Sequence, residues 1–241
     1  MTGVQTCALP ICVTCKATGR VIDLDEESTQ RLKTALEAAH QAIWRAGGGP
    51  TRVQMNCSGK HSGMVVTCAV NHWSMDDYLH VDHPLQKRIT DTIPDVAGEE
   101  AFSIGVDGCG APAHVLSLTG LARALRAMAT GAAGDSGLQI HRAMSQHSYM
   151  VGGEKRDVTA ICTNVPGLMA KDGAEAVYVA ALPDGRAVAL KLSDGFGRGT
   201  ATVLVAALKK LGVDTSNVPD TITEVAYGHG KPVGRIRAVG F

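Results

Sequence analysis

One segment limits the fold of this chain more than any other: residues 176–195, AVYVAALPDGRAVALKLSDG. Two runs with the alternating pattern of β-strands are joined by Pro183-Asp184-Gly185, a sequence typical of hairpin turns. An Ala/Val/Leu-rich stretch at residues 199–211 follows and has helical character. The pattern predicts an antiparallel hairpin in the middle or near the edge of the main sheet, with this helix packed on it.

Most of the remaining chain is expected to be helical. A loosely alternating run, Ala101–Val106, predicts a strand that enters a turn at Asp107–Gly110. Helices followed by an antiparallel hairpin that helices cover indicate the α+β class. The expected helices are Asp25–Ala46, one within residues 61–70, one after His83–Pro84, Leu116–Met128 and Gly137–Met150.

Size and charge argue for one globular domain without a charged partner. The chain has 241 residues, 45% of them hydrophobic, which suits one sizeable core. Lys plus Arg equals Asp plus Glu at 23 each, so no long-range field points to nucleic acid or to an anionic membrane. No apolar run approaches the roughly 20 residues of a membrane span, and no signal peptide is evident, so we expect a cytoplasmic protein.

The first residues, Met1–Ile11, resemble the conceptual translation of a sequencing adapter, with an ordinary short N-terminus as the alternative. On the first interpretation the protein is one domain over residues 12–241, and the CxxC of Cys12 and Cys15 is expected to have no function. The seven cysteines are unevenly spread, which argues against a disulfide framework.

The densest group of reactive residues is NCSGKHSG at residues 56–63, which opens a predicted helix. A helix N-terminus lowers a thiol pKa and binds anions. Cys57 and His61 are four residues apart and could hold one metal ion from the same helix face. The alternative is a helix start with a buried Cys57 and a solvated Lys60.

Two further motifs could take part in chemistry. Asp107-Gly108-Cys109-Gly110 describes a tight turn that presents its side chains, and together with Cys57 it suggests a structural or substrate-orienting zinc site. Lys171 lies at a glycine turn before the hairpin and could act as a general base or stabilise an anion, although most loop lysines are simply solvated. The sequence contains no Ser-x-x-Lys, and its nearest approach is Ser58 beside Lys60.

Five motifs occur together and in order: NCSGKHSGM, HPLQ, VDGCGAP, MAKDGAEAVY and PVGRIRAVG. In this combination the chain, from about Ala38 to its end, resembles the bacterial L-asparaginase II family. The resemblance implies a serine β-lactamase-like fold and hydrolysis of L-asparagine to L-aspartate and ammonia. It also implies zinc, held by Cys57, Lys60 and Cys109 and used mainly to position the substrate. From the residues alone His61 would be chosen instead of Lys60.

The resemblance extends to the other site residues. It places Asp107 beside the metal as a catalytic residue, matches Lys171 to a catalytic lysine that pairs with a serine, and leaves His61, Ser58 and Gly59 to contact the substrate. The family has roughly a hundred more N-terminal residues, including the nucleophile. The chain as written is therefore expected to be an inactive fragment, and a version extended with natural upstream sequence is expected to be active.

Other readings of the sequence stay open at this point. The chain could be a non-catalytic zinc-binding remnant, or a penicillin-recognising hydrolase of the same fold. The second is disfavoured because the CSGKH and DGCGAP motifs have no part in that chemistry. The expected partner is L-asparagine, with neither nucleic acid nor membrane, and a homodimer is compatible with the sequence, which does not fix the oligomeric state.

Overall fold

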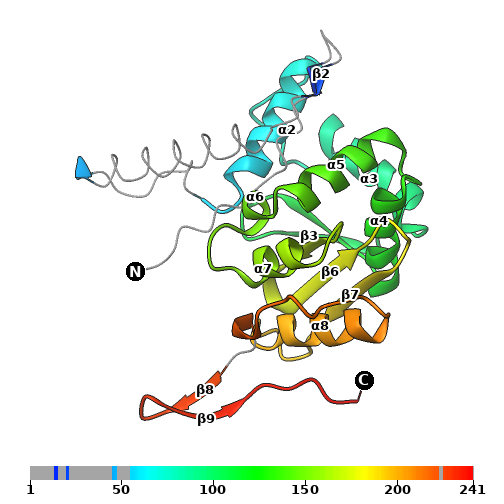
Figure 1. The fold of residues 1–241 in the computed structure, drawn as a ribbon. Helices are drawn as coiled ribbons and strands as arrows, with labels where there is room; N and C mark the ends of the chain where they lie inside the picture. The colour runs from blue at the N-terminus through cyan, green and yellow to red at the C-terminus, as the bar shows by residue number, and fades with distance from the viewer. Residues whose placement is uncertain (1–13, 16–19, 22–44, 48–54, 223–224, 241) are drawn as a thin grey trace.

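The computed structural model describes residues 14–15, 20–21, 45–47, 55–222 and 225–240. Its centre is a three-stranded antiparallel sheet in the order β5-β6-β7 (Figure 1). The strands are β5 (Met169–Asp172), β6 (Val177–Ala181) and β7 (Ala187–Lys191). The predicted hairpin is confirmed, because β6 and β7 pair with Ala181 opposite Ala187 across the PDGR turn. β6 is the middle strand, and β7 ends the sheet.

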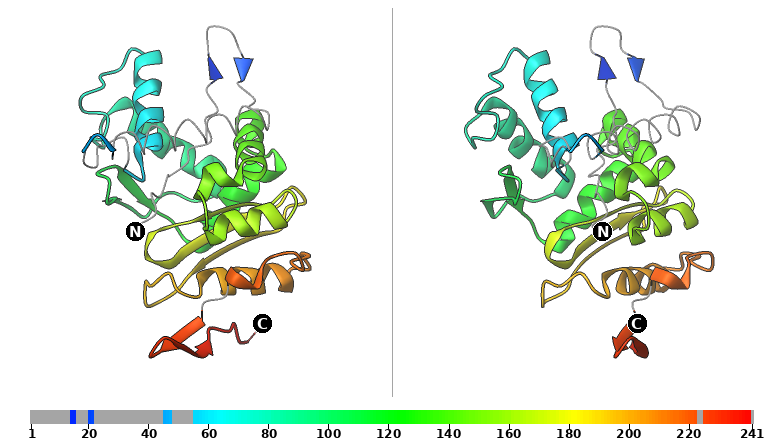
Figure 2. Two further views of the ribbon diagram at one scale, coloured as in Figure 1. Left: turned by 60° about the vertical axis from the view of Figure 1, so that its left-hand side comes forward. Right: turned by 90° about the vertical axis from the view of Figure 1, so that its left-hand side faces the viewer.

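Helices cover both faces of this sheet, because successive side chains of β6 point to opposite sides. Tyr178 and Ala180 belong to a buried cluster with α7 (Asp157–Asn164) and α8 (Thr200–Lys210). Val179 and Ala181 belong to a second cluster, with α4 (Leu118–Thr130) and α5 (Gly134–Gln146). Figure 2 shows the sheet between these two layers, which agrees with the α+β class and with the predicted packing of α8 on the hairpin.

A smaller group of elements lies beyond α4. Helix α2 (Ser58–Val70) contacts α3 (Pro84–Ala97), and α3 packs on α4. The hairpin of β3 (Ser103–Val106) and β4 (Pro112–Val115) lies beside them (Figure 2). Helix α3 has Pro84 in its first turn, a position that proline favours. Its N-cap residue is His83, whose ring accepts a hydrogen bond from the Leu85 N–H at 3.1 Å.

The remaining described elements are short. The segment after α8 ends in a separate hairpin of β8 (Val225–Gly228) and β9 (Lys231–Arg235), which protrudes from the body of the molecule (Figure 1). The other short elements are β1 (Thr14–Cys15), β2 (Arg20–Val21), α6 (Ser148–Gly152), and the 3₁₀ turns η2 (Ala174–Ala176) and η3 (Asp220–Ile222). No helix in the described ranges is long and apolar enough to cross a membrane.

Several sequence expectations need correction. The single helix expected over Gly137–Met150 is wrong: α5 starts three residues earlier, and a break at His147 separates it from α6. Lys171 lies within strand β5 rather than in a loop. The helix expected at Asp25–Ala46 and the adapter-like start Met1–Ile11 lie almost wholly outside the described residues, as does Cys12 of the CxxC pair.

Candidate functional site

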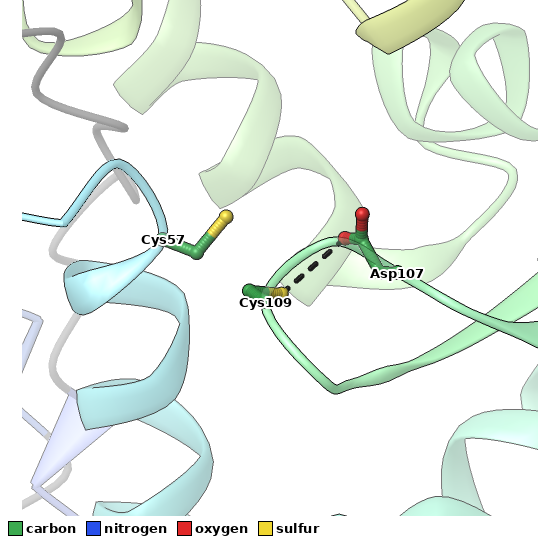
Figure 3. A group of neighbouring side chains, drawn as sticks. All are labelled: Cys57, Asp107 and Cys109. Carbon is green, nitrogen blue, oxygen red and sulfur yellow. Dashed lines mark hydrogen bonds between the residues drawn. The ribbon is translucent and has the colours of Figure 1, made fainter.

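Two segments far apart in the sequence meet at the start of α2. Cys57 is the N-cap residue of this helix. Cys109 lies in the turn between β3 and β4, which is closed by hydrogen bonds from the Asp107 N–H to the Ala111 carbonyl and from the Gly110 N–H to the Asp107 carbonyl, both 2.8 Å. Gly110 has a φ of 85°, a conformation that glycine adopts without strain. The turn therefore presents Cys109 and Asp107 toward the helix start (Figure 3).

The side chains at this junction form a compact polar cluster. The sulfur of Cys57, a carboxylate oxygen of Asp107 and the sulfur of Cys109 all lie within 4.8 Å of one another. The Lys60 ammonium, one turn into α2, donates to Asp107 Oδ2 at 2.9 Å, and the Cys109 thiol donates to the same oxygen at 3.4 Å. We call these four residues the Cys-Lys-Asp cluster. The predicted convergence of Cys57, Lys60 and Cys109 is present in the structure.

The charges within the cluster stabilise one another. Partial burial of Lys60 by itself lowers its pKa, but the hydrogen bonds to Asp107 and Cys109 outweigh burial, and the pKa of Lys60 lies above its ordinary value. The hydrogen bond from Lys60 holds the pKa of Asp107 below its ordinary value, although desolvation opposes this. At neutral pH the cluster therefore contains a Lys60–Asp107 ion pair in contact with the Cys109 thiol.

The donor set of the cluster suits zinc. Two thiolates and a carboxylate are common zinc ligands, with bonds of about 2.0 to 2.3 Å. Ligand atoms around one zinc ion then lie roughly 3 to 4 Å apart, so donors already within 4.8 Å need only small side-chain rotations. Lys60 is in reach of the same centre, but its ammonium must lose a proton before the nitrogen can bind a metal.

The three predicted substrate-contacting residues lie in the first turn of α2. Ser58 and Gly59 open the helix, whose N-terminus has no side-chain cap. The His61 ring is hydrogen-bonded through Nδ1 to the Tyr78 hydroxyl at 2.6 Å, and its Nε2 atom is buried with no hydrogen-bond partner among the described residues. Desolvation lowers the pKa of His61, and the Lys60 charge adds to this effect, so the ring is neutral at neutral pH.

Lys171 belongs to a second polar group, which it forms with Asp172 and Arg156. Its ammonium donates to the Asp172 carbonyl and to Asp172 Oδ1, the latter at 2.9 Å. The other oxygen of Asp172 accepts a hydrogen bond from Arg156. Arg156, Asp157 and Asp172 line one side of a pocket of about 280 Å³ that Gly197 and Thr200, at the start of α8, also border.

The pKa values in this second group are shifted in opposite directions. Burial raises the pKa of the Asp157 carboxyl, and the charge of Asp172 adds to the rise. At Asp172 burial acts in the same sense, but the positive charges of Lys171 and Arg156 outweigh it and lower the pKa. Sequence reasoning missed Arg156, Asp172 and Tyr78, because only their spatial contacts single them out. Asp172 contacts Lys171, Arg156 contacts Asp172, and Tyr78 contacts His61.

The sequence model of L-asparaginase II matches residues 21–238. The chain belongs to the L-asparaginase II family. This match includes both segments of the Cys-Lys-Asp cluster, Lys171 and its partners, and the whole central sheet. A comparison with curated proteins found no match.

Proposed function

We propose that this protein is an L-asparagine amidohydrolase, which hydrolyses the side-chain amide of L-asparagine to give L-aspartate and ammonia. Membership of the L-asparaginase II family suggests asparagine hydrolysis in general. The observation that carries the proposal for this chain is the Cys-Lys-Asp cluster, in which two separate sequence motifs of the family form one site. The helix-covered antiparallel sheet is compatible with a serine β-lactamase-like fold, which we propose as well.

We further propose that the cluster holds zinc through Cys57, Lys60 and Cys109. A zinc ion there would supply a positive centre that orients a carboxylate or amide oxygen of the substrate. Asp107 lies close enough either to bind the metal itself or to hold Lys60 in place. With its carboxylate and the two thiols, the half-exposed site offers at least three metal donors.

The start of α2 supplies the proposed substrate contacts. The first N–H groups of a helix have no partner within the helix and favour anions, and the N-cap residue Cys57 makes no side-chain cap hydrogen bond here. Because the Ser58 N–H already donates to the Met55 carbonyl at 3.0 Å, the proposed donors to the α-carboxylate of the amino acid are the Gly59 N–H and the Ser58 hydroxyl. The neutral His61 ring is held by Tyr78, and because its Nε2 atom is buried without a hydrogen-bond partner among the described residues, a substrate contact through this atom requires the ring or its surroundings to move.

The proposed reaction follows the covalent route of serine amidohydrolases. A serine hydroxyl attacks the amide carbon, ammonia leaves, and water then hydrolyses the acyl-enzyme. Lys171, fixed by Asp172, is the proposed general base or anion-stabilising cation of this route. Among residues 55–222 and 225–240 no serine hydroxyl makes a hydrogen bond to a lysine, so the structure does not pair Lys171 with a nucleophile.

Binding of L-asparagine to the zinc-loaded protein is the sharpest test. Recognition depends on the described cluster, whereas turnover also requires a serine. We expect calorimetry to detect L-asparagine binding with zinc, and binding to weaken at least tenfold in Cys109→Ala and Lys60→Met. Lys209→Met, an exposed lysine on α8, is the matched control and should bind as the parent does.

Ammonia release is measured in the same samples with L-asparagine, L-glutamine and a β-lactam. Release of ammonia from L-asparagine that Lys171→Met abolishes supports the full proposal. Binding without any release, both by this chain and by a version extended with natural upstream sequence, would favour the non-catalytic alternative and overturn the enzyme assignment. Absence of L-asparagine binding by folded, zinc-loaded protein, or hydrolysis of the β-lactam alone, would overturn the proposed substrate.

A further inference from the structure

Cys57 and Cys109 bring two thiols together from opposite sides of one junction. Their sulfur atoms are no more than 4.8 Å apart, although 51 residues separate them in the sequence. A disulfide bond is about 2.05 Å long, so the sulfurs must approach by at most about 2.7 Å. Figure 3 shows the Cys57 side chain directed toward the turn that bears Cys109.

Both cysteines lie at the ends of elements. Cys57 is the N-cap residue of α2, and its side chain makes no cap hydrogen bond to that helix. Cys109 is at the tip of the β3–β4 turn, between two glycines, and a Cβ added at the first of these, Gly108, would meet no atom within 4 Å. Rotation of the two side chains, with a small shift of this turn, would bring the sulfurs to bonding distance.

Access to solvent separates these thiols from the other described cysteines. Cys57 and Cys109 are half-buried, whereas Cys68 and Cys162 are 0% and 4% exposed. Burial also raises the pKa of Cys68 and brings that of Cys162 to about 12, which withholds the reactive thiolate. A small oxidant can therefore reach the first pair and not the second.

We propose that Cys57 and Cys109 are a thiol–disulfide modification site that reacts with low-molecular-weight disulfides such as oxidised glutathione. One cysteine, after losing its proton to solvent, attacks a sulfur of the small disulfide and forms a mixed disulfide, and the first small thiol leaves with a proton. The second cysteine, which also loses its proton, attacks the protein sulfur of this mixed disulfide and releases the second small thiol. Two protein thiols are oxidised to one disulfide, and one small disulfide is reduced to two thiols.

This modification would regulate the proposed metal site, because a disulfide sulfur no longer binds zinc as a thiolate. Oxidation removes both sulfur ligands at once and leaves the Lys60–Asp107 ion pair in the cluster. Conversely, bound zinc occupies both sulfurs and protects them. The regulatory role rests on the proposed zinc-dependent function, whereas formation of the disulfide depends only on the geometry of the two thiols.

Peptide mapping of the full chain tests the proposal without an activity assay. The reduced, metal-free protein is treated with oxidised glutathione, remaining thiols are alkylated, and the trypsin digest is read by mass spectrometry. Trypsin places Cys57 in peptide 53–60 and Cys109 in peptide 89–123. We expect these two peptides to be joined in most molecules, and Cys68 and Cys162 to react with alkylating agent only after denaturation.

Two comparisons decide the outcome. Preloading with zinc should slow formation of the joined peptide at least tenfold, and Cys109→Ser should leave Cys57 as a glutathione adduct. Separate glutathione adducts on both cysteines, reduced thiols, or predominant pairing with Cys7, Cys12 or Cys15 would overturn the proposal. A joined peptide that forms equally fast with zinc supports the disulfide and removes the proposed zinc ligation, so the two proposals fail in different ways.

Discussion

At the scale of single residues, Lys60 and Asp107 compete for the same role in the proposed zinc site. If Lys60 is the nitrogen ligand, Lys60→Met should weaken zinc binding about 10- to 100-fold, and Asp107→Asn should weaken it less, since Asp107 would then act through Lys60. Competition with a chromophoric chelator measures both affinities, with the exposed Lys87→Met as control. A larger loss in Asp107→Asn, with Lys60→Met unchanged, would make the carboxylate the third ligand instead.

Two neighbouring carboxylates, Asp157 and Asp172, should respond oppositely to pH. The lowered pKa of Asp172 means that its contribution to folding is present above its unfolded pKa and is lost as pH falls through the folded value. The raised pKa of Asp157 means that its charged form opposes folding, so its favourable contribution is present at low pH and is lost as pH rises through the folded value.

Urea unfolding of two variants checks these signs. At pH 7, Asp172→Asn should destabilise the protein by about 1–3 kcal/mol, since it removes the negative charge and one of the two side-chain oxygens that accept from Lys171 and Arg156. Asp157→Asn should be neutral or stabilising at that pH. The deficit of Asp172→Asn should shrink below about pH 4. Equal losses in both variants at pH 7, or a deficit that does not change with pH, would contradict the assigned charges.

At the scale of elements, the sequence was most informative where local chemistry decides the structure. The hairpin was predictable because β-alternation and turn residues coincide around Pro183, and the turn at Asp107–Gly110 because two glycines flank a cysteine. The break at His147 and strand β5 were not predictable, since tertiary contacts decide them. Strand β5 pairs with β6, with Met169 opposite Ala181. This pairing makes Lys171 and its neighbours a strand, although their local sequence resembles that of a loop.

The hairpin turn offers a prediction at the same scale. Gly185 has a φ of 91°, and a Cβ there would lie 3.3 Å from Arg126 Nε, the group that donates to the Gly185 carbonyl. Gly185→Ala should therefore lower the free energy of unfolding by about 1–2 kcal/mol or more. Gly134→Ala is the control, because its φ is 73° but no atom lies within 4 Å of the added Cβ, so strain alone acts. Equal losses would show that the contact with Arg126 adds nothing.

At the scale of the whole molecule, the family motifs could locate the Cys-Lys-Asp cluster but not its surroundings. NCSGK and VDGCGAP named the cysteines and Lys60, and the structure brings them together as expected. The carboxylate of Asp107 within reach of both sulfurs, and the Arg156–Asp172 contact beside Lys171, depend on how α2, α7 and β5 are placed relative to other elements. Spacing along a sequence does not determine such placement.

The same placement predicts how zinc should change the stability of the molecule. The cluster joins the start of α2 to the β3–β4 turn, and among the described elements α2 contacts α3, α3 packs on α4, and α4 lies against the central sheet. A ligand that binds only the folded state stabilises it by about 2.7 kcal/mol at 100 times its dissociation constant, so zinc should raise the melting temperature by several degrees.

Hydrogen exchange should slow mainly at residues 55–70 and 103–115, and little in β5, β6 and β7, whose packing does not involve the cluster. Cys109→Ser should lose most of both effects while keeping the melting temperature of the metal-free protein within a few degrees. Zinc-induced protection spread evenly over the sheet, or an unchanged response in Cys109→Ser, would place the metal elsewhere.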